Sequence, residues 1–310
     1  MPDFMVSAAT RINRPIEEVV STIGDFNTWS HWSPWLCLEP EATVESYGEP
    51  STLGHGYRWE GKKVGSGEMV WKDILPTQLY ANLTFLKPFK SQAKVGFLLT
   101  EVDGGTEVEW VMDSSLPFYL FFMVKVMKGM ITMDYSRGLA QLKDYIETGD
   151  VSFSMEAKGI VDVPSVHYLG VSNSTPMSEM SESMGSTFGE LMQKFESAGL
   201  TISGEPLAVY NKMSIARGQC DYTAAIPVGE ALAVDRDGLN AGVVNAGKAY
   251  KVIHRGPYRH LGNSWALAMS DVRHLKLKTL KSQKPFERYI NDPANTPEKD
   301  LVTEILVPVR

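Results

Sequence analysis

Two pairs of short segments recur in the C-terminal half of the chain. Residues 206–210 (PLAVY) resemble residues 285–289 (PFERY), and residues 225–228 (AIPV) resemble residues 306–309 (LVPV). The segments come in the same order, and each first segment follows a stretch with helical spacing of apolar residues. This repeat constrains the fold more than any other feature, because two copies of one unit are expected to share a core.

Each copy predicts a strand, a helix and then two strands, a β-α-β-β unit. The predicted elements are strands at 166–171, 207–211 and 220–228 with a helix at 178–198, then strands at 250–254, 286–290 and 301–309 with a helix at 258–280. Two such halves would join along a groove, a frequent place for a ligand.

Glu304 breaks the apolar pattern of the last strand, 301–309 (LVTEILVPV). Aligning the two copies places Thr223 opposite Glu304. A carboxylate stranded among apolar groups costs several kcal/mol unless it is paired, protonated or at a wet cavity wall. Glu304 is therefore a candidate ligand-facing or catalytic residue, and the alternative is an edge-strand charge or a glutamate paired with a nearby Arg.

The N-terminal half has a different order of elements. A strand at 4–12 precedes a helix that starts near Pro15, and a run of strands separated by turn residues fills 41–116. A long amphipathic helix then ends before Gly149, and its apolar stripe is Ile131, Tyr135, Leu139, Leu142 and Ile146. An antiparallel sheet that grips a long helix is the helix-grip arrangement, an α+β fold.

Residues 2–148 contain a set of motifs: Phe26-Asn27 with Trp29, 32–35 (WSPW), 57–61 (YRWEG), 65–67 (GSG), Phe85 with 87–89 (KPF), 105–110 (GTEVEW), and Gly138-Leu139 with Leu142-Lys143. These motifs look like the polyketide cyclase/dehydrase branch of the START-like (SRPBCC) superfamily. The resemblance implies the helix-grip fold and a hydrophobic cavity more than a fixed activity. Five strand aromatics, Trp59, Trp71, Phe85, Phe97 and Trp110, either fill the core or line that cavity.

Residues 154–310 contain a second set of motifs: 254–258 (HRGPY), Trp265, 285–293 (PFERYINDP), 296–298 (TPE), 303–305 (TEI) and 307–309 (VPV). With these motifs the segment resembles the GyrI-like domain, which is also the effector-binding part of AraC-type and multidrug-sensing regulators. The resemblance implies a duplicated β-α-β-β domain with an aromatic ligand pocket. It assigns pocket roles to Glu304, Tyr289, Tyr258 and Trp265, and also to Tyr222, where the alternative for each aromatic is core packing.

The boundaries that we predict are therefore a START-like domain at 1–148 and a GyrI-like domain at 154–310. The regulators carry a DNA-binding helix-turn-helix where this chain carries the START-like domain. Direct binding to nucleic acid is not expected, since the net charge is −7 and the pI is about 5.5.

Composition and cysteine placement indicate a soluble cytoplasmic protein. The chain is 43% hydrophobic and 22% charged, its two cysteines, Cys37 and Cys220, lack metal-ligand spacing, and its start has no secretion signal. We expect free thiols and neither a metal nor a cofactor. The apolar segment 116–127 is shorter than the roughly 20 residues of a membrane span, so it predicts the start of a buried helix, with membrane-surface contact as the alternative.

The leading functional prediction is a two-module binder of hydrophobic, possibly cationic, small molecules. Aromatic faces and a partly desolvated anion favour a large organic cation. A second prediction is a hydrolase of reactive small molecules, similar to cyclopropanoid hydrolases, with Glu304 as general base. A third is inhibition of a protein partner such as a topoisomerase.

Overall fold

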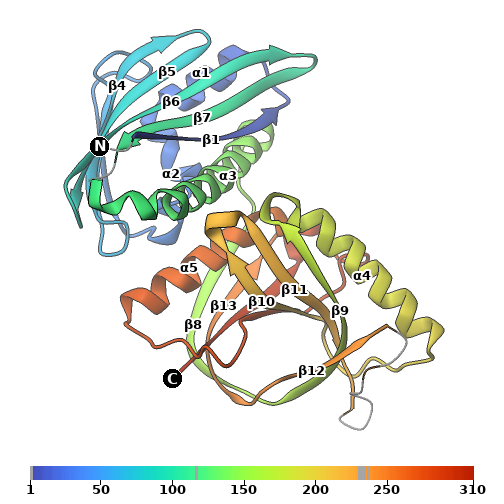
Figure 1. Ribbon diagram of the computed structural model, residues 1–310. Coiled ribbons are helices and arrows are strands. Elements are labelled where there is room, and N and C mark those ends of the chain that lie inside the picture. The colour runs from blue at the N-terminus through green and yellow to red at the C-terminus, as the bar shows by residue number, and fades with distance from the viewer. Residues whose placement is uncertain (1–2, 116–117, 230–234, 236–237) are drawn as a thin grey trace. The chain divides into compact units, whose positions relative to one another are not determined.

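The computed structural model describes residues 1–310 except 1–2, 116–117, 230–234 and 236–237. The chain divides into two compact units, Met1–Val151 and Ser152–Arg310, which we describe separately. Both are α+β units built on one antiparallel sheet (Figure 1).

The N-terminal unit is a seven-stranded sheet in the order β1-β7-β6-β5-β4-β3-β2, in which neighbouring strands are antiparallel. Its strands are β1 Asp3–Ile12, β2 Thr43–Tyr47, β3 Gly56–Glu60, β4 Ser66–Leu75, β5 Gln78–Lys87, β6 Ser91–Val102 and β7 Gly105–Ser115. Its helical segments are α1 Ile16–Gly24, η1 Phe26–Thr28, α2 Trp29–Trp32, η2 Leu36–Leu38, η3 Phe118–Met123 and α3 Val124–Thr148. This is the predicted helix-grip fold.

Helix α3 packs on the sheet through the predicted apolar stripe. Tyr135, Leu139 and Leu142 are at most 1% exposed, and Ile131 packs against the same core. The helix ends at Gly149, whose φ of 83° is a left-handed C-cap that glycine adopts without strain.

The strand aromatics fill the core of this unit. Trp110 stacks on Tyr135 of α3 with ring centroids 4.2 Å apart, and Phe26 stacks on Trp71 at 4.9 Å. Trp71, Phe97 and Trp110 are fully buried, Trp59 is buried, and Phe85 is partly buried. Of the two alternatives for these five aromatics, the structure therefore shows core packing.

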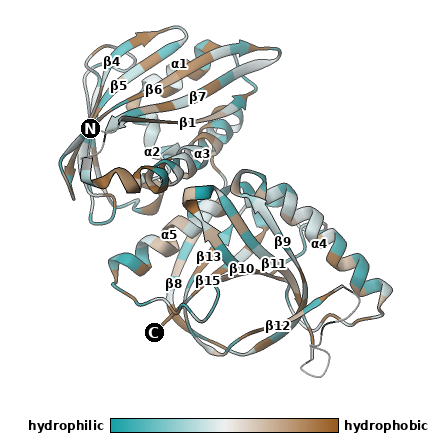
Figure 2. Ribbon diagram, in the orientation of Figure 1, coloured by the Kyte–Doolittle hydropathy of each residue, from teal (hydrophilic) through white to brown (hydrophobic). Residues whose placement is uncertain are grey.

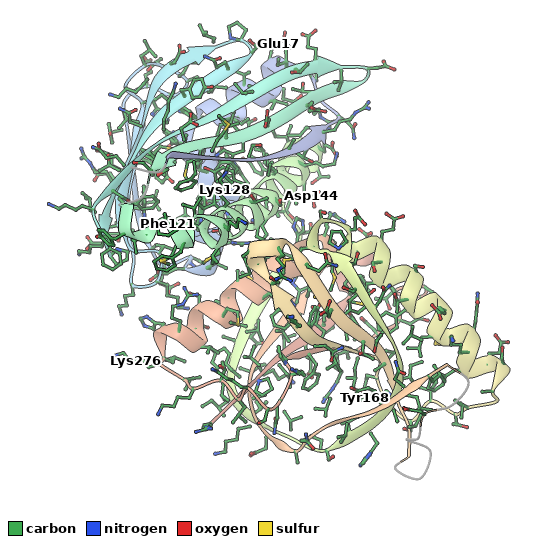
Figure 3. The ribbon with its side chains drawn as sticks, viewed as in Figure 1. Glu17, Phe121, Lys128, Asp144, Tyr168 and Lys276 are labelled. Atoms are coloured by element: carbon green, nitrogen blue, oxygen red, sulfur yellow. The ribbon has the colours of Figure 1, made fainter. Side chains whose placement is uncertain are left out.

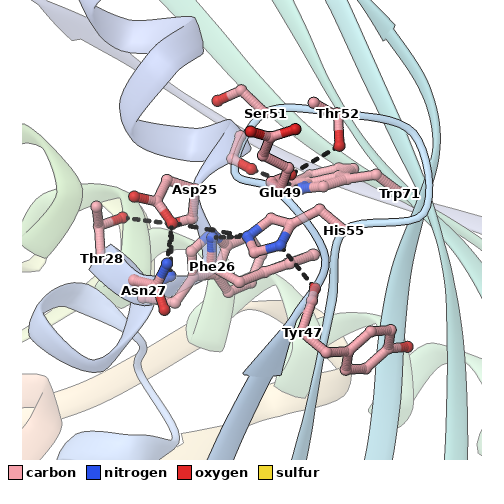
Figure 4. A network of polar contacts seen from close by, with 12 residues as sticks. Asp25, Phe26, Asn27, Thr28, Tyr47, Glu49, Ser51, Thr52, His55 and Trp71 are labelled. Carbon is pink, nitrogen blue, oxygen red and sulfur yellow. Dashed lines mark hydrogen bonds and ion pairs between the residues drawn. The ribbon is translucent and has the colours of Figure 1, made fainter.

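A buried histidine joins the helical and strand parts of this core (Figure 4). His55 Nε2 accepts a hydrogen bond from the backbone N–H of Phe26 at 3.0 Å, and Nδ1 lies 2.9 Å from the carbonyl oxygen of Tyr47. Because a backbone N–H can only donate, Nδ1 carries the proton and donates to that carbonyl. His55 thereby ties η1 to the end of β2.

The segment predicted to start a buried helix is different in the structure. Residues 116–117 lie outside the described residues, but Tyr119, Phe121 and Phe122 are 72%, 61% and 66% exposed. Leu120 and Val124 pack against the core. The start of this helix is thus apolar on its solvent side as well as on its core side.

The C-terminal unit is an eight-stranded sheet in the order β12-β9-β11-β10-β14-β15-β13-β8. Its strands are β8 Ser154–Val163, β9 Val166–Pro176, β10 Leu207–Ser214, β11 Gln219–Pro227, β12 Asn240–Val244, β13 Gly247–Arg255, β14 Phe286–Tyr289 and β15 Val302–Val309. Its helical segments include η4 Met177–Glu179, α4 Met180–Ser197, η5 Ile215–Arg217, η7 Tyr258–His260, α5 Leu261–His274 and η8 Glu298–Asp300. Strands β8 and β12, which the sequence did not predict, lie at the two edges.

The strand order and register confirm the predicted duplication. The sequence β9-α4-β10-β11 matches β13-α5-β14-β15, and the strands of each half lie in the order first, third, second. In the first half Tyr210 pairs with Tyr222, and Val209 pairs with Thr223. The equivalent pairs of the second half are Tyr289 with Thr303 and Arg288 with Glu304. The two halves meet where β10 pairs with β14.

The pseudo-twofold axis runs between Ala208 and Glu287. These residues pair with each other across the junction, and the flanking pairs are Leu207 with Arg288 and Val209 with Phe286. A twofold rotation that exchanges the halves converts the pair Leu207–Arg288 into the pair Phe286–Val209. Ala208 and Glu287 therefore occupy equivalent positions in the two halves.

Candidate functional site

Glu287 is a carboxylate buried at the junction of the two halves. Its side chain lies on the face of the sheet that α4 and α5 cover, and the residue is 1% exposed. Strand alternation fixes this position, because Phe286 and Arg288 on either side point to the opposite face. A buried carboxylate is costly unless hydrogen bonds compensate it.

Three aromatic donors supply those hydrogen bonds. Tyr210 Oη donates to Oε1 at 2.8 Å, Trp265 Nε1 donates to the same oxygen at 2.5 Å, and Tyr289 Oη donates to Oε2 at 2.5 Å. The donors come from β10, α5 and β14, so both halves of the domain contribute. Tyr210 and Tyr289 are repeat counterparts that converge on one carboxylate.

Burial and hydrogen bonding act on Glu287 in opposite directions. Burial raises the pKa of the carboxyl above its ordinary value, and the hydrogen bonds from Tyr289, Trp265 and Tyr210 lower it by less. The pKa values of Tyr210 and Tyr289 rise well above the ordinary range because both phenols are buried, with the Glu287 charge as the next cause. Both phenols therefore stay protonated as donors.

A second group of rings surrounds these donors. Tyr258 and Phe188 each contact Tyr289 edge to face, with centroids 5.6 and 5.5 Å apart, and Tyr210 meets Trp265 at 5.0 Å. Phe188, Tyr258, Trp265 and Tyr289 are partly exposed. We call this set the Glu287 cluster: Glu287, Tyr210, Tyr289, Trp265, Tyr258 and Phe188.

The structure places Glu304 away from the aromatics that were predicted to surround it. Glu304 pairs with Arg288 across β14 and β15, and this register puts both on the face opposite Glu287. Its carboxylate contacts Lys251 Nζ and, at 3.4 Å, Arg288 Nη1. The predicted orientation into an aromatic pocket is therefore corrected, and the geometry is that of the alternative, a glutamate paired with a nearby Arg.

The other predicted site residues separate into two groups. Tyr289, Trp265 and Tyr258 lie together in the Glu287 cluster. Tyr222 is fully buried, and its hydroxyl lies 2.7 Å from Ser183 Oγ and 2.8 Å from Thr187 Oγ1 of α4. Tyr222 therefore has the geometry of a core residue.

The sequence reasoning missed Glu287 although a signal for it was present. Aligning residues 206–210 (PLAVY) with 285–289 (PFERY) places Glu287 opposite Ala208. The first copy has no charged residue in this segment. A charge that replaces alanine at one of two equivalent positions indicates a local change of role. The stronger contrast at Glu304 directed the prediction to the opposite face of the sheet.

The N-terminal unit contains a cavity of about 610 Å³ where β6 and β7 separate. The pairing of these strands stops at Lys94 and Asp113, whereas β1 and β7 stay paired to Ser115. Phe4, Leu83 and Ala93 are apolar lining residues at this end. Nothing comparable was predicted at a specific place from the sequence.

Among the residues that the structure describes, no group of three or more His, Cys, Asp or Glu side chains could hold a metal ion. Within the same residues, no helix has the length and apolar character needed to cross a bilayer. Cys37 and Cys220 are not joined by a disulfide bond.

Comparison with known proteins finds solved structures of low sequence identity. No curated protein sequence matches this chain significantly. The structure of an EcmrR–DNA complex is 20% identical with a TM-score of 0.42, over 62% of this chain and 69% of that one. SAV2435 bound to tetraphenylphosphonium is 16% identical with a TM-score of 0.38, over 50% and 94%. DynU16, from the dynemicin biosynthetic locus, is 15% identical with a TM-score of 0.36, over 99% and 87%.

At this level of similarity these structures indicate nothing about the ligand of this chain. The family models are informative. Residues 3–147 match the family described as polyketide cyclase / dehydrase and lipid transport, and residues 159–310 match the GyrI-like small molecule binding domain. Together with the helix-grip sheet and the duplicated β-α-β-β sheet, these matches identify the chain as a START-like polyketide cyclase/dehydrase domain fused to a GyrI-like small-molecule-binding domain.

Proposed function

We propose that the C-terminal domain binds a hydrophobic organic cation at the Glu287 cluster. The observation that carries the proposal is a carboxylate with 1% exposure that three aromatic donors hold at the junction of the two halves. Stability alone does not favour such an arrangement, because an apolar residue of similar volume avoids the desolvation cost. Its counterpart in the other half is Ala208, which meets the packing requirement at the same sheet position.

The aromatic rings define the chemistry of the ligand. A cation would meet the partly exposed rings of Tyr258, Trp265 and Tyr289 first, with the charge of Glu287 behind them. Cation–π attraction contributes about 0.5–2 kcal/mol, depending on desolvation. A charge about 5 Å away adds roughly 3 kcal/mol at an effective dielectric constant of about 20. Together these terms favour a cation over a neutral molecule of the same shape.

The hydrolytic alternative has less support. Three of the about four lone-pair positions of Glu287 already accept hydrogen bonds, and both oxygens of Glu304 contact a cationic side chain that favours the unprotonated form. A general base needs a free lone pair directed at the proton that it takes. We therefore assign Glu287 a binding role and Glu304 a structural one.

Titration with tetraphenylphosphonium and with neutral triphenylphosphine oxide tests the proposal. The matched variants are Glu287→Gln and Glu304→Gln, which make the same change on neighbouring strands and opposite faces. For Glu287→Gln we expect at least a ~10-fold loss of affinity for the cation and less than a ~3-fold change for the neutral compound, because only the Coulomb contribution is lost. For Glu304→Gln we expect less than a ~3-fold change for either.

Circular dichroism and thermal unfolding would establish that both variants are folded before titration. Failure of the parent protein to bind tetraphenylphosphonium below millimolar concentration would contradict the proposal. So would an equal loss for the charged and neutral compounds in Glu287→Gln, because the carboxylate would then support only the shape of the site. If Glu304→Gln lost more affinity for the cation than Glu287→Gln, the binding site would lie on the face of the sheet that carries Glu304.

A further inference from the structure

The first half of α3 is apolar on two sides. On the inner side Val124, Met127 and Ile131 pack against the core of the N-terminal unit. On the outer side a stripe at three- and four-residue spacing is exposed, and it comprises Phe122 (66%), Val126 (37%), Met130 (42%) and Met133 (40%). A helix with one side on the core normally presents polar residues to water on the other.

The second half of the same helix follows that rule. Tyr135, Leu139, Leu142 and Ile146 are buried, and after Met133 this fully described helix exposes none of its large apolar side chains. Figure 2 shows the contrast as a brown start of α3 that gives way to paler and teal residues. The outer apolar stripe is therefore specific to the start of the helix.

A second element adds apolar side chains at the same end of the sheet. The β5–β6 hairpin closes with Phe85 opposite Ser91, next to the end of β7 at Ser115, from which the chain continues to η3 and α3. Phe89 at the hairpin tip is 80% exposed and Leu86 is 49% exposed. Two aromatic-bearing elements thus extend from one end of the N-terminal unit.

The charges in the two segments that carry these exposed side chains are all positive, and Asp134, directly after the second segment, pairs with Arg137. Residues 86–94 contain Lys87, Lys90 and Lys94, and residues 114–133 contain Lys125 and Lys128, with no Asp or Glu in either segment. Lys87 pairs with Glu60, and Lys94 lies over the ring of Tyr80. Lys90, Lys125 and Lys128 are exposed, while the chain as a whole has a net charge of −7. Positive charge is therefore concentrated where apolar side chains are exposed.

We propose that this end of the N-terminal unit docks on the surface of a bilayer that contains anionic lipids. We call it the docking end and define it by Phe89, Lys90, Tyr119, Phe121, Phe122, Lys125, Val126, Lys128, Met130 and Met133. Figure 3 shows Phe121 at the start of the helix and Lys128 further along it, with Asp144 near the other end. Interfacial helices insert aromatic and aliphatic side chains below the headgroups, and lysines beside them bind the anionic headgroups.

Charge complementarity selects this occupant over a second copy of the chain. A twofold interface would bring the same patch from each copy together, so Lys125 and Lys128 would face their own equivalents. Like charges oppose that contact, whereas an anionic lipid surface attracts each of them.

Vesicle flotation of the full chain tests the proposal. The probes are vesicles of phosphatidylcholine alone and vesicles with about 30% phosphatidylglycerol, at low and high salt. We expect binding to the anionic vesicles that is at least ~10-fold stronger than to neutral ones and weaker at ~0.5 M NaCl, because salt screens exposed charges. Inorganic phosphate at millimolar concentration should not compete, since the apolar side chains need a bilayer.

Two variants change the docking end without touching the core. Phe121→Ser with Phe122→Ser removes exposed rings, and Lys125→Glu with Lys128→Glu reverses the charge. Each pair should weaken binding to anionic vesicles by at least ~10-fold. The matched controls are Met192→Ser with Met213→Ser and Lys281→Glu with Lys284→Glu, which change exposed residues of the C-terminal unit and should alter binding by less than ~3-fold.

Three results would overturn the proposal. The first is no flotation of the parent chain with anionic vesicles. The second is equal binding by the parent and the docking-end variants. The third is a concentration-dependent dimer that Phe121→Ser with Phe122→Ser makes monomeric, because a second copy would then cover this surface.

Discussion

Glu287 and Glu304 occupy neighbouring strands of one sheet, but a register offset of one residue places them on opposite faces. Glu287 is held by three neutral aromatic donors beneath α5, whereas Glu304 is held by the cations Lys251 and Arg288. Neutral donors do not cancel the negative charge of an ionised carboxylate, which the proposed cation site requires. Cationic partners neutralise it, so the partners of a carboxylate matter more for its function than its depth of burial.

The two halves of the C-terminal domain give a second form of the same comparison. Ala208 and Glu287 are counterparts at the axis, and so are Thr223 and Glu304. Each carboxylate therefore exists in one half only. Glu287 lies at the axis of the covered face, where both halves contribute donors.

The largest effect is expected from Ala208→Glu, which copies the buried carboxylate into the other half. Ala208 is fully buried and pairs directly with Glu287, so the new side chain adds volume and a like charge to a closed site. We expect a loss of about 4 kcal/mol or more in the free energy of unfolding, measured by urea denaturation.

The double variant Ala208→Glu with Glu287→Gln separates charge from volume. With one carboxylate left at the axis, about 1 kcal/mol or more of the loss should be recovered because the repulsion is gone. No recovery would show that crowding alone explains the damage. Unchanged stability of the single variant would mean that the covered face accommodates charge freely, which would remove the contrast between the faces.

A pH effect of intermediate size is expected from His254, also on the covered face. Its ring is fully buried, Nδ1 lies 2.9 Å from Ser264 Oγ, and Nε2 lies 3.2 Å from the carbonyl oxygen of Pro257. Burial is the main cause that lowers the pKa of His254 from 6.5 to about 4. Between pH 6.5 and about pH 4, His254 is therefore protonated more readily in the unfolded chain than in the folded one.

Stability from His254 is fully present above pH 6.5 and is lost as the pH falls toward about 4. The shift corresponds to roughly 3 kcal/mol in the free energy of unfolding, measured by urea denaturation across this range. His254→Gln should reduce the slope of the free energy of unfolding against pH. His274→Gln, which changes an exposed residue at the end of α5, should leave this slope as in the parent. A slope that survives His254→Gln unchanged would assign the effect to other groups.

The smallest effect is expected on the opposite face, from Glu304→Gln. The Glu304, Lys251 and Arg288 side chains are 13%, 20% and 22% exposed, so solvent screens the two ion pairs in part. We expect a loss of about 1 kcal/mol, which decreases as salt is added. A double-mutant cycle with Lys251→Met would measure the coupling directly. A loss above ~3 kcal/mol would show that Glu304 is buried as effectively as Glu287 and would erase the difference between the faces.

The fold was largely accessible from the sequence because periodicity and repetition are local signals. The stripe from Ile131 to Ile146 fixed the buried side of α3, and the echo between residues 206–210 and 285–289 predicted the halves and their register. The edge strands β8 and β12 were missed because they lie outside the repeat. The helix predicted to reach residue 280 ends at His274, where Leu275 caps it and Lys276 takes a positive φ of 54°.

The candidate site was only partly accessible. Tyr289, Trp265 and Tyr258, predicted for one pocket, lie together in the structure, but the carboxylate among them is Glu287, and Glu304 lies on the opposite face. Both glutamates interrupt apolar strands, and their partners decide their roles. Those partners, Trp265 for one and Lys251 for the other, come from distant parts of the sequence, so only the three-dimensional pairing distinguishes the two residues.

The hydrogen bond from Tyr210 to Glu287 has a mechanical consequence. Three residue pairs join the two halves along β10 and β14, backbone hydrogen bonds from Tyr210 to Pro285 and from Tyr289 to Pro206 flank them, and the Tyr210–Glu287 bond links the halves beside this seam. Tension applied between β10 and β14 is therefore shared between backbone hydrogen bonds and side-chain links, which include the contact of Tyr210 with Trp265. A molecule that draws Glu287 away from Tyr210 would remove one of these links and shift its share of the load to the others.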